Sequence, residues 1–266
     1  MSASAPAATA ARRRRRVRRV PQPAFTVALL AVASPALAGL PFVTDDPATQ
    51  EQGHFEIDLE GQYTLNRGGQ SGSTPGLEVH YGITDHLEII TIVPMAFEHP
   101  TGGASVVGLG DIQFATKWRF LDADNDGWRP AIAFEPTIIL PTGNANRGLG
   151  TGFTQAFLPI WLSKDFGQFT VFGGGGYNIN PGRDNRNFWF TGVGVTYTID
   201  PQWTIGAEVF RTTADTTGGT SSVAFNLGVI YNIDDNNHLM MSAGRGITNA
   251  AQNNQFSTFI AYQLTF

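Results

Sequence analysis

Charged residues at alternate positions are the most chemically suggestive feature of this sequence. Glu56, Asp58 and Glu60 alternate with apolar residues, and successive side chains of a strand point to opposite faces, so these carboxylates would share one face. The full set expected on the inner side of the first five strands is Glu56, Asp58, Glu60, Glu78, His80, Glu88, Asp111, Lys117, Arg119 and Glu135. Such a wall could select solutes by charge, as rings of charged side chains do in pores. Alternatively, it could form ion pairs that only fill and rigidify the interior.

The later part of the chain would supply a different inner wall. Small residues are expected to face inward at Gly174, Gly176, Gly192, Gly194, Gly206 and Gly228, with Phe188, Phe190 and Phe210 nearby in register. Small residues leave room, and aromatic rings offer a surface to an apolar solute. We therefore predict an interior that is acidic on one side and open, partly aromatic, on the other. It would pass small neutral or cationic solutes.

Other motifs that could carry chemistry are weaker. The stretch 122–127 matches the first half of a calcium loop, but Ala133 occupies the position of the closing glutamate, so we interpret it as an Asp-rich turn. The histidines lack metal-ligand spacing; they are His54, His80, His86, His99 and His238. We predict no metal site and no cofactor. No G-x-S-x-G stretch is present, so a Ser–His lipid or ester hydrolase is a weaker alternative, and we predict that the chain is not an enzyme.

The elements that must position these residues are long strands. They are expected at residues 53–66, 74–83, 86–98, 108–121, 128–141, 151–164, 167–180, 186–199, 202–214, 220–233, 237–248 and 254–266. Strands of soluble proteins average about 5–6 residues, whereas a tilted strand needs about 9–11 to cross a membrane. The sequence thus predicts an all-β fold, a single antiparallel transmembrane β-barrel of about 12 strands over residues 53–266. A ten-stranded barrel is the alternative if one hairpin is miscounted.

Two details refine this barrel. Pro94, Pro136 and Pro159 lie inside expected strands and predict bulges or local breaks, because proline cannot donate to a ladder. Five short turns lie at one end, and nearby aromatic residues predict an interfacial belt there: Tyr81, Trp118, Phe120, Trp128, Trp161, Tyr197, Trp203, Tyr231 and Phe266. The alternative is that these rings seal the open end of a soluble sandwich.

The N-terminal residues predict export. Residues 12–19 contain seven arginines, residues 24–34 form a short apolar stretch, and Ala36-Leu37-Ala38 provides a cleavage site, so residues 1–38 are expected to be a signal peptide. The alternative, a basic arm that binds nucleic acid, would explain the arginines but not the apolar stretch and the cleavage site that follow them. Removal of residues 1–38 leaves 10 basic and 22 acidic residues, a net charge of 10 − 22 = −12, which disfavours nucleic acid as a partner. Residues 39–52 are expected to be a periplasmic segment that could fold into the barrel.

The C-terminal residues indicate the membrane in which the barrel is inserted. The last strand would pair with the first and turn Ile260, Tyr262, Leu264 and Phe266 toward lipid. A terminal aromatic with apolar residues at alternate positions resembles the sorting signal that the barrel-assembly machinery reads. The sequence therefore predicts a Gram-negative type outer membrane, with periplasmic termini. Its expected partners are outer-membrane lipids, the barrel-assembly machinery and a small-molecule solute.

Several short phrases, taken in their order, carry a family resemblance. They are Leu40–Pro47 followed by Gly53–Glu56, then Tyr81–Asp85, Val93-Pro94, Gly108–Ile112 leading to Lys117–Phe120, and Leu140–Gly143. Together they resemble the outer-membrane protein family named for the MetA pathway of phenol degradation. The resemblance covers most of the chain after residue 38. It implies passive passage of aromatic or other small hydrophobic compounds across the outer membrane. A plugged structural or interaction barrel without transport is the alternative.

Overall fold

The computed structural model of the protein describes residues 41–124 and 126–266. The expected signal peptide at residues 1–38 lies outside the described residues. No helix in the described part of the chain is long and apolar enough to cross a membrane.

Long antiparallel strands make up almost all of the described chain. They are β1 (Phe55–Asn66), β2 (Gly69–Thr84), β3 (Leu87–Pro100), β4 (Val106–Leu109), β5 (Ile112–Leu121), β6 (Ala131–Phe134), β7 (Thr137–Leu140), β8 (Gln155–Phe166), β9 (Phe169–Ile179), β10 (Phe188–Thr198), β11 (Trp203–Thr212), β12 (Ser222–Asn232), β13 (Asn237–Thr248) and β14 (Phe256–Thr265). A short 3-10 helix spans Ala145–Arg147, and α1 spans Ala250–Asn253.

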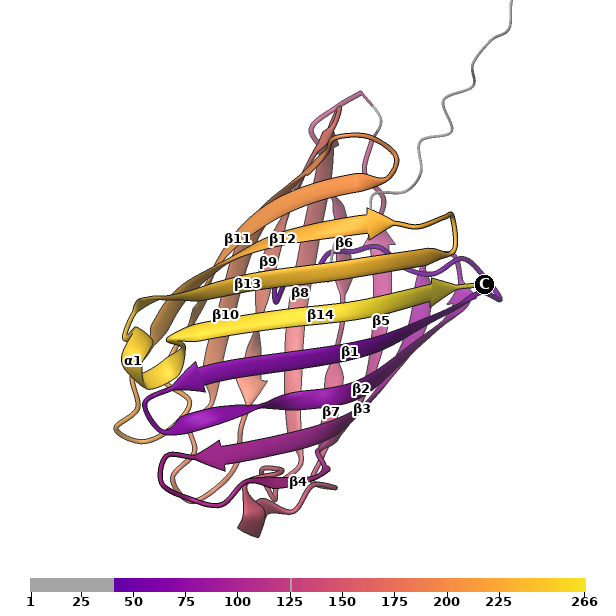
Figure 1. The fold of residues 1–266 in the computed structure, drawn as a ribbon. Coiled ribbons are helices and arrows are strands. Elements are labelled where there is room, and N and C mark those ends of the chain that lie inside the picture. Colours follow the sequence, from indigo (N-terminus) through magenta and orange to yellow (C-terminus); the bar gives the residue numbers. More distant parts are fainter. Residues whose placement is uncertain (1–40, 125) are drawn as a thin grey trace, which may run out of the picture. The chain divides into compact units, whose positions relative to one another are not determined.

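These segments form a closed barrel of twelve strands. β4 and β5 both pair with β3, so together they form one interrupted strand. β6 and β7 both pair with β8 and form another, which reduces the fourteen segments to twelve strands. β1 pairs with β14 along its length, from Glu56 opposite Thr265 to Leu65 opposite Phe256. Figure 1 shows this closure where the indigo β1 lies beside the yellow β14. The predicted fold class is confirmed, and closure leaves no exposed edge between first and last strands.

The prolines coincide with the irregular part of the barrel wall. Pro136 separates β6 from β7. Pro94 and Pro159 lie within continuous strands, and their carbonyls accept hydrogen bonds from the interrupted neighbours, Gly110 N at 2.9 Å and Glu135 N at 3.2 Å. The interruption therefore occurs at Pro136 and beside Pro94 and Pro159, as expected for residues without an N–H.

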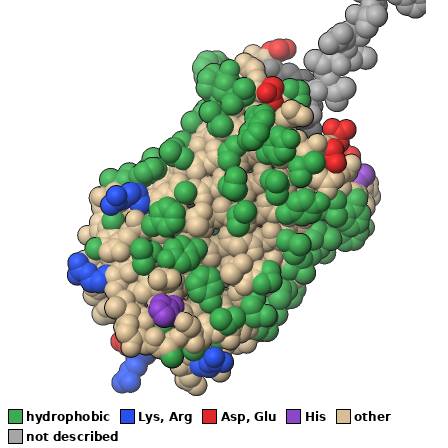
Figure 2. Space-filling model, in the orientation of Figure 1, with side chains coloured by type: hydrophobic (Ala, Val, Ile, Leu, Met, Phe, Trp, Pro, Cys, Tyr) green, Lys and Arg blue, Asp and Glu red, His purple; other side chains and the backbone are tan. Residues whose placement is uncertain are grey.

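Side chains alternate between an apolar outer face and a polar inner face. On β1, Leu59 is 53% exposed whereas Asp58 is 0% exposed. On β14, Ile260 faces outward while Gln263 is buried inside, and Phe266, which follows β14, is exposed. Figure 2 shows apolar side chains spread over the strands of one outer face. This pattern is the reverse of a soluble protein and suits an outer surface in lipid.

Aromatic residues gather at the end of the barrel that carries the short turns, called here the turn end. Three cross-strand pairs have ring centroids 4.5–4.7 Å apart: Phe55 with Tyr81 at 4.6 Å, Phe169 with Tyr197 at 4.7 Å, and Trp203 with Tyr231 at 4.5 Å. Trp161 does not belong to this group. It is only 3% exposed and points inward, because it shares the inner face of β8 with Pro159.

Exposed charges differ between the two ends. Acids outnumber bases at the turn end, where Arg129 is an exposed base and the exposed acids are Glu51, Asp85, Asp122, Asp126, Asp165, Asp200, Asp234 and Asp235. The opposite end, called the loop end, has exposed arginines at Arg67, Arg147, Arg183 and Arg186, together with Asp184 and Asp215. Figure 2 shows blue side chains toward one end of the barrel and red side chains toward the other.

Candidate functional site in the barrel lumen

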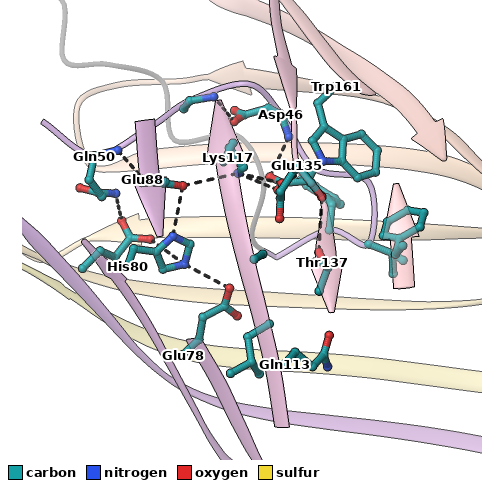
Figure 3. A pocket seen from close by; sticks show the side chains of 18 of the residues that line it. Asp46, Gln50, Glu78, His80, Glu88, Gln113, Lys117, Glu135, Thr137 and Trp161 are labelled. Carbon is teal, nitrogen blue, oxygen red and sulfur yellow. Dashed lines mark hydrogen bonds and ion pairs between the residues drawn. The ribbon is translucent and has the colours of Figure 1, made fainter. Parts of the chain in front are cut away.

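The interior of the barrel, its lumen, contains a cavity of about 410 Å³. Charged side chains from β1, β2, β3 and β5 line it together with Asp45, Asp46 and Glu135. The remaining lining includes neutral polar side chains and the apolar or aromatic Phe42, Phe157, Trp161 and Met240. Figure 3 shows the charged side chains converging from neighbouring strands. The lumen therefore combines carboxylates with an aromatic surface in one space.

One group of lumen residues, the acidic cluster, consists of Glu56, Asp58, Glu78, His80 and Glu88. The imidazole Nε2 of His80 lies 3.1 Å from Glu78 Oε1, 3.8 Å from Glu56 Oε1 and 3.9 Å from Asp58 Oδ2. Its Nδ1 lies 3.4 Å from Glu88 Oε1. The register of β1 against β2 creates this cluster, since Glu56 lies opposite His80 and Asp58 opposite Glu78.

A second group, the Lys117 cluster, surrounds a buried ammonium. Lys117 Nζ lies 2.7 Å from Asp45 Oδ2, 3.4 Å from Glu135 Oε2 and 3.9 Å from Glu88 Oε1. Trp161 Nε1 donates a 2.9 Å hydrogen bond to Glu135 Oε2, which ties the aromatic wall to the charged one. A buried charge is costly unless it is paired, so Lys117 compensates several carboxylates that would otherwise repel one another.

Residues 41–52, called the inner segment, enter the lumen: residues 41–50 lie inside it, and Glu51 and Gln52 are exposed at the turn end. The backbone N–H groups of Val43 and Thr44 donate to the Glu208 carboxylate, each at 2.9 Å. Ser242 Oγ donates to the Pro41 carbonyl at 2.6 Å. Near the opposite wall, Gln50 N donates to Glu88 Oε2 at 2.7 Å. The inner segment thus crosses the lumen from β3 to the wall formed by β11 and β13.

The glycine wall is occupied, and the prediction that it is open is wrong. A Cβ added at Gly206 or Gly228 would come within 2.8 Å of the Phe42 ring, and one at Gly192 would collide with Thr44 Oγ1. Strand periodicity places these glycines inward but cannot show what approaches them. Residues 41–44 pack against Gly192, Gly206 and Gly228, whereas Gly174, Gly176 and Gly194 lie against residues of the barrel itself, among them Trp161, Pro159 and Phe172.

The aromatic residues form a cluster beside the inner segment. Phe190 packs edge-on against Phe157 and Trp161, with centroids 6.2 and 6.1 Å away, and stacks with Phe210 at 6.0 Å. Also inside the lumen, Phe42 of the inner segment packs against Phe172 of β9, with ring centroids 5.5 Å apart. The partly aromatic surface is therefore present, but much of it contacts protein.

Glu60 and Asp111 lie away from both clusters. Glu60 is buried on the inner face of β1, next to Gly76. Asp111 accepts hydrogen bonds from Gly143 N at 2.9 Å and Thr151 N at 2.7 Å, so it braces a loop at the loop end.

Arg119 lies at the turn end rather than in the cavity. Its Nη2 donates to the Asp85 carbonyl at 2.8 Å, and its Nε lies 3.0 Å from Asp122 Oδ1. A hydrogen bond with His86 and the nearby charges of His86 and Arg119 lower the pKa of the Asp122 carboxyl. Asp124, in the same Asp-rich turn, pairs with Lys164 Nζ at 2.8 Å. These carboxylates therefore hold the turn through side-chain cations.

One Ser–His contact occurs outside the lumen. His99 Nδ1 lies within hydrogen-bond distance of Ser105 Oγ in an exposed region at the loop end. Within residues 41–124 and 126–266, no carboxylate pairs with this imidazole, so the third group of a hydrolytic triad is missing there.

The fold resembles solved outer-membrane channels and porins. The COG4313 outer membrane channel from Pseudomonas putida F1 superposes with a TM-score of 0.65 at 17% identity, covering 83% of this chain and 98% of that one. The NanC porin gives 0.55 at 11% identity, covering 79% and 98%. The KdgM porin gives 0.54 at 12% identity, covering 79% and 99%. No curated protein sequence matches the chain.

The sequence itself identifies the family. Residues 45–264 match the family described as "Putative MetA-pathway of phenol degradation". This match includes most of the inner segment and every strand of the barrel, and only the last residue of β14 lies outside it. The chain therefore belongs to that family.

Proposed function

We propose that this protein is an outer-membrane channel for passive passage of small neutral or cationic solutes, aromatic ones among them. The cavity of about 410 Å³ carries the proposal, because carboxylates and an aromatic surface line the same space. Its volume lies within the range of small-molecule sites, about 300–1,000 Å³.

Charge in the lumen favours cations over anions. Glu56, Glu78, Glu88, Glu135, Asp45 and Asp46 line the cavity, and the cationic lining side chains are Lys117 and, when protonated, His80. A solute cation would offset the excess of carboxylates, whereas an anion would add to it. Trp161 and Phe157 supply ring faces for an aromatic or alkylammonium solute.

The comparisons support the same proposal. The solved structures with similar folds are named as an outer membrane channel and as porins. The family description refers to phenol degradation, which is consistent with aromatic solutes. The proposal includes two further points: the barrel lies in the outer membrane, and residues 1–38 are a signal peptide that directs export.

Neutralising the first acidic strand is expected to reduce cation selectivity. The triple variant Glu56→Gln, Asp58→Gln and Glu60→Gln removes three inward carboxylates of β1. We expect the cation-to-anion permeability ratio to fall several-fold, measured from the reversal potential of purified protein in a planar bilayer under a salt gradient. Glu98→Gln, near the loop end of β3, is the control and should change the ratio little. Unchanged selectivity in the triple variant would contradict a charge-selecting wall.

The solute class is tested in the same bilayer. Discrete conductance steps that a small aromatic ammonium ion blocks at micromolar to millimolar concentration would support the proposal. Steps that an aromatic anion blocks equally well would argue against cation preference. The neutral analogue shows how much of the block comes from the ring alone.

A second candidate function is a plugged barrel that passes nothing. The inner segment favours it, since Pro41, Phe42 and Thr44 are buried inside the lumen. A silent bilayer from correctly folded protein would support this alternative. The chain would then serve a structural or interaction role in the membrane.

We also propose that the C-terminal strand is read by the barrel-assembly machinery. Phe266→Ala is expected to reduce the yield of folded barrel in the outer membrane several-fold, because it removes the terminal aromatic. The assay is the heat-modifiable gel shift of membrane fractions. Phe256→Ala is the control, since Phe256 is an exposed aromatic at the other end of β14. Equal yields of the two variants would contradict the signal.

A further inference from the structure

The acidic cluster has the geometry of a metal site. One donor atom each from Glu56, Asp58 and His80 lies within 4.8 Å of the others, and all three residues are buried. Zn²⁺ lies about 2.0–2.2 Å from nitrogen and carboxylate ligands, so ligands of one ion are about 3–4.5 Å apart. The separations of 3.8 and 3.9 Å from His80 Nε2 to the two carboxylates fall in this range.

Asp58 supplies an independent sign of a missing partner. Its side chain is 0% exposed, and neither carboxylate oxygen has a hydrogen-bond partner within residues 41–124 and 126–266. Opposite it on β14, the amide oxygen of the buried Gln263 is also unpartnered in the described residues. Buried polar atoms are almost always satisfied, so unsatisfied acceptors side by side are explained either by a bound cation or by a proton on Asp58.

The orientation of His80 also suits a ligand. Metal-bound histidines commonly donate their second ring N–H to a carboxylate, which fixes the tautomer. Here Nδ1 faces Glu88 at 3.4 Å, and Glu88 itself accepts from Gln50 N at 2.7 Å. With the proton on Nδ1, the Nε2 lone pair points toward Glu56, Asp58 and Glu78.

We propose that Glu56, Asp58 and His80 bind one divalent transition-metal ion of the Zn²⁺ type, with Glu78 as a further ligand. The imidazole favours Zn²⁺ over Ca²⁺ and Mg²⁺, which prefer sites made entirely of oxygen. Glu56, Glu78, His80 and Gln263 line the lumen cavity, so an ion can reach the site through the lumen. Glu88 is a positioning residue that orients the imidazole.

Direct binding measurements test the site on protein purified from outer membranes and stripped with chelator. We expect one Zn²⁺ per barrel by titration calorimetry, and Co²⁺ to give visible absorption bands that Zn²⁺ abolishes. His80→Asn and Asp58→Asn should each weaken Zn²⁺ binding at least tenfold. His238→Asn is the matched control, because His238 is also buried on an inner face but bonds Asn232. Each variant is first shown to fold by its heat-modifiable gel shift.

The unfolding temperature distinguishes two explanations of the unpartnered Asp58 carboxyl: a bound metal ion and a bound proton. With chelator present, Asp58→Asn should unfold at a higher temperature than the unchanged protein, because it removes an unpaired buried charge. With Zn²⁺ present, the order should reverse, since only the unchanged protein gains the ion.

Three results would overturn the proposal: no Zn²⁺ binding by the folded protein, equal binding by His80→Asn, or stability that Zn²⁺ leaves unchanged. Ca²⁺ binding as tight as that of Zn²⁺ would also overturn the assignment, because it would remove the role of the imidazole. These outcomes do not depend on whether any solute crosses the barrel.

Discussion

Gly192→Ala is expected to raise single-channel conductance several-fold. A Cβ at this position would collide with Thr44 Oγ1 and crowd Thr44 Cβ, and Thr44 is 0% exposed, so we expect the inner segment to be displaced. Once displaced, residues 41–44 would no longer occupy the lumen beside β10 to β13. The wider path would carry more ions. The measurement is the conductance of single barrels in a planar bilayer.

Two further variants decide whether displacement is the cause. Thr44→Gly combined with Gly192→Ala removes the colliding side chain and should return conductance toward its original value. Gly61→Ala adds the same methyl group to an outward position on β1, where the nearest atom is Thr74 Oγ1 at 3.2 Å, and should leave conductance unchanged. If Gly192→Ala conducts like the unchanged protein, the inner segment is not what limits ion flow.

Glu208→Ala also tests whether the inner segment limits ion flow, because it changes the wall residue that holds the segment. The Glu208 carboxylate accepts from Val43 N, Thr44 N and Asn226 Nδ2, the last at 2.6 Å. Its removal leaves the buried N–H of Thr44 and the partly buried N–H of Val43 without their acceptor. We expect the change to act in the same direction as Gly192→Ala.

Lys117→Met is expected to lower the free energy of unfolding by about 3–5 kcal/mol. Removing one partner of a buried ion pair leaves an uncompensated charge, and costs of this size are typical. Only 6% of the Lys117 side chain is exposed, and Asp45, Glu88 and Glu135 would lose their common cation. The loss of the Asp45 contact would also loosen the inner segment.

Urea unfolding in detergent micelles measures this cost. Lys117→Arg keeps the charge and should recover most of the stability. Lys164→Met removes a lysine that pairs with Asp124 in a turn, and it should cost much less, because water screens that carboxylate. Adding Glu135→Gln to Lys117→Met should restore part of the loss. Equal costs for Lys117→Met and Lys164→Met would mean that water in the lumen screens the cluster fully.

The barrel could be predicted because its determinants are local. Alternation along each segment fixes which residues face inward, and strand length separates a membrane barrel from a soluble sandwich. The prediction is wrong for Trp161. Its nearness to a turn in the sequence predicts a place in the interfacial aromatic belt. Its position relative to Pro159 on β8 places it on the inner face instead.

The lumen was less predictable because its contacts depend on register and on a segment without periodicity. Alternation places Glu56 and His80 inside, but only the pairing of β1 with β2 sets them opposite each other. Residues 41–52 form no strand, so no pattern locates them. The signal that could have located them is the pair Gly206 and Gly228, which lie opposite each other and leave a groove for Phe42.

The separation of charge between the two ends gives the barrel an electric polarity along its axis. Aspartates at the turn end and arginines at the loop end set up a fixed potential difference between the two ends, which salt screens over about 8–10 Å. A conduit with oppositely charged mouths conducts more readily under one sign of voltage than under the other. At low ionic strength this barrel would behave as a rectifier, with cations accumulating at the turn end and anions at the loop end.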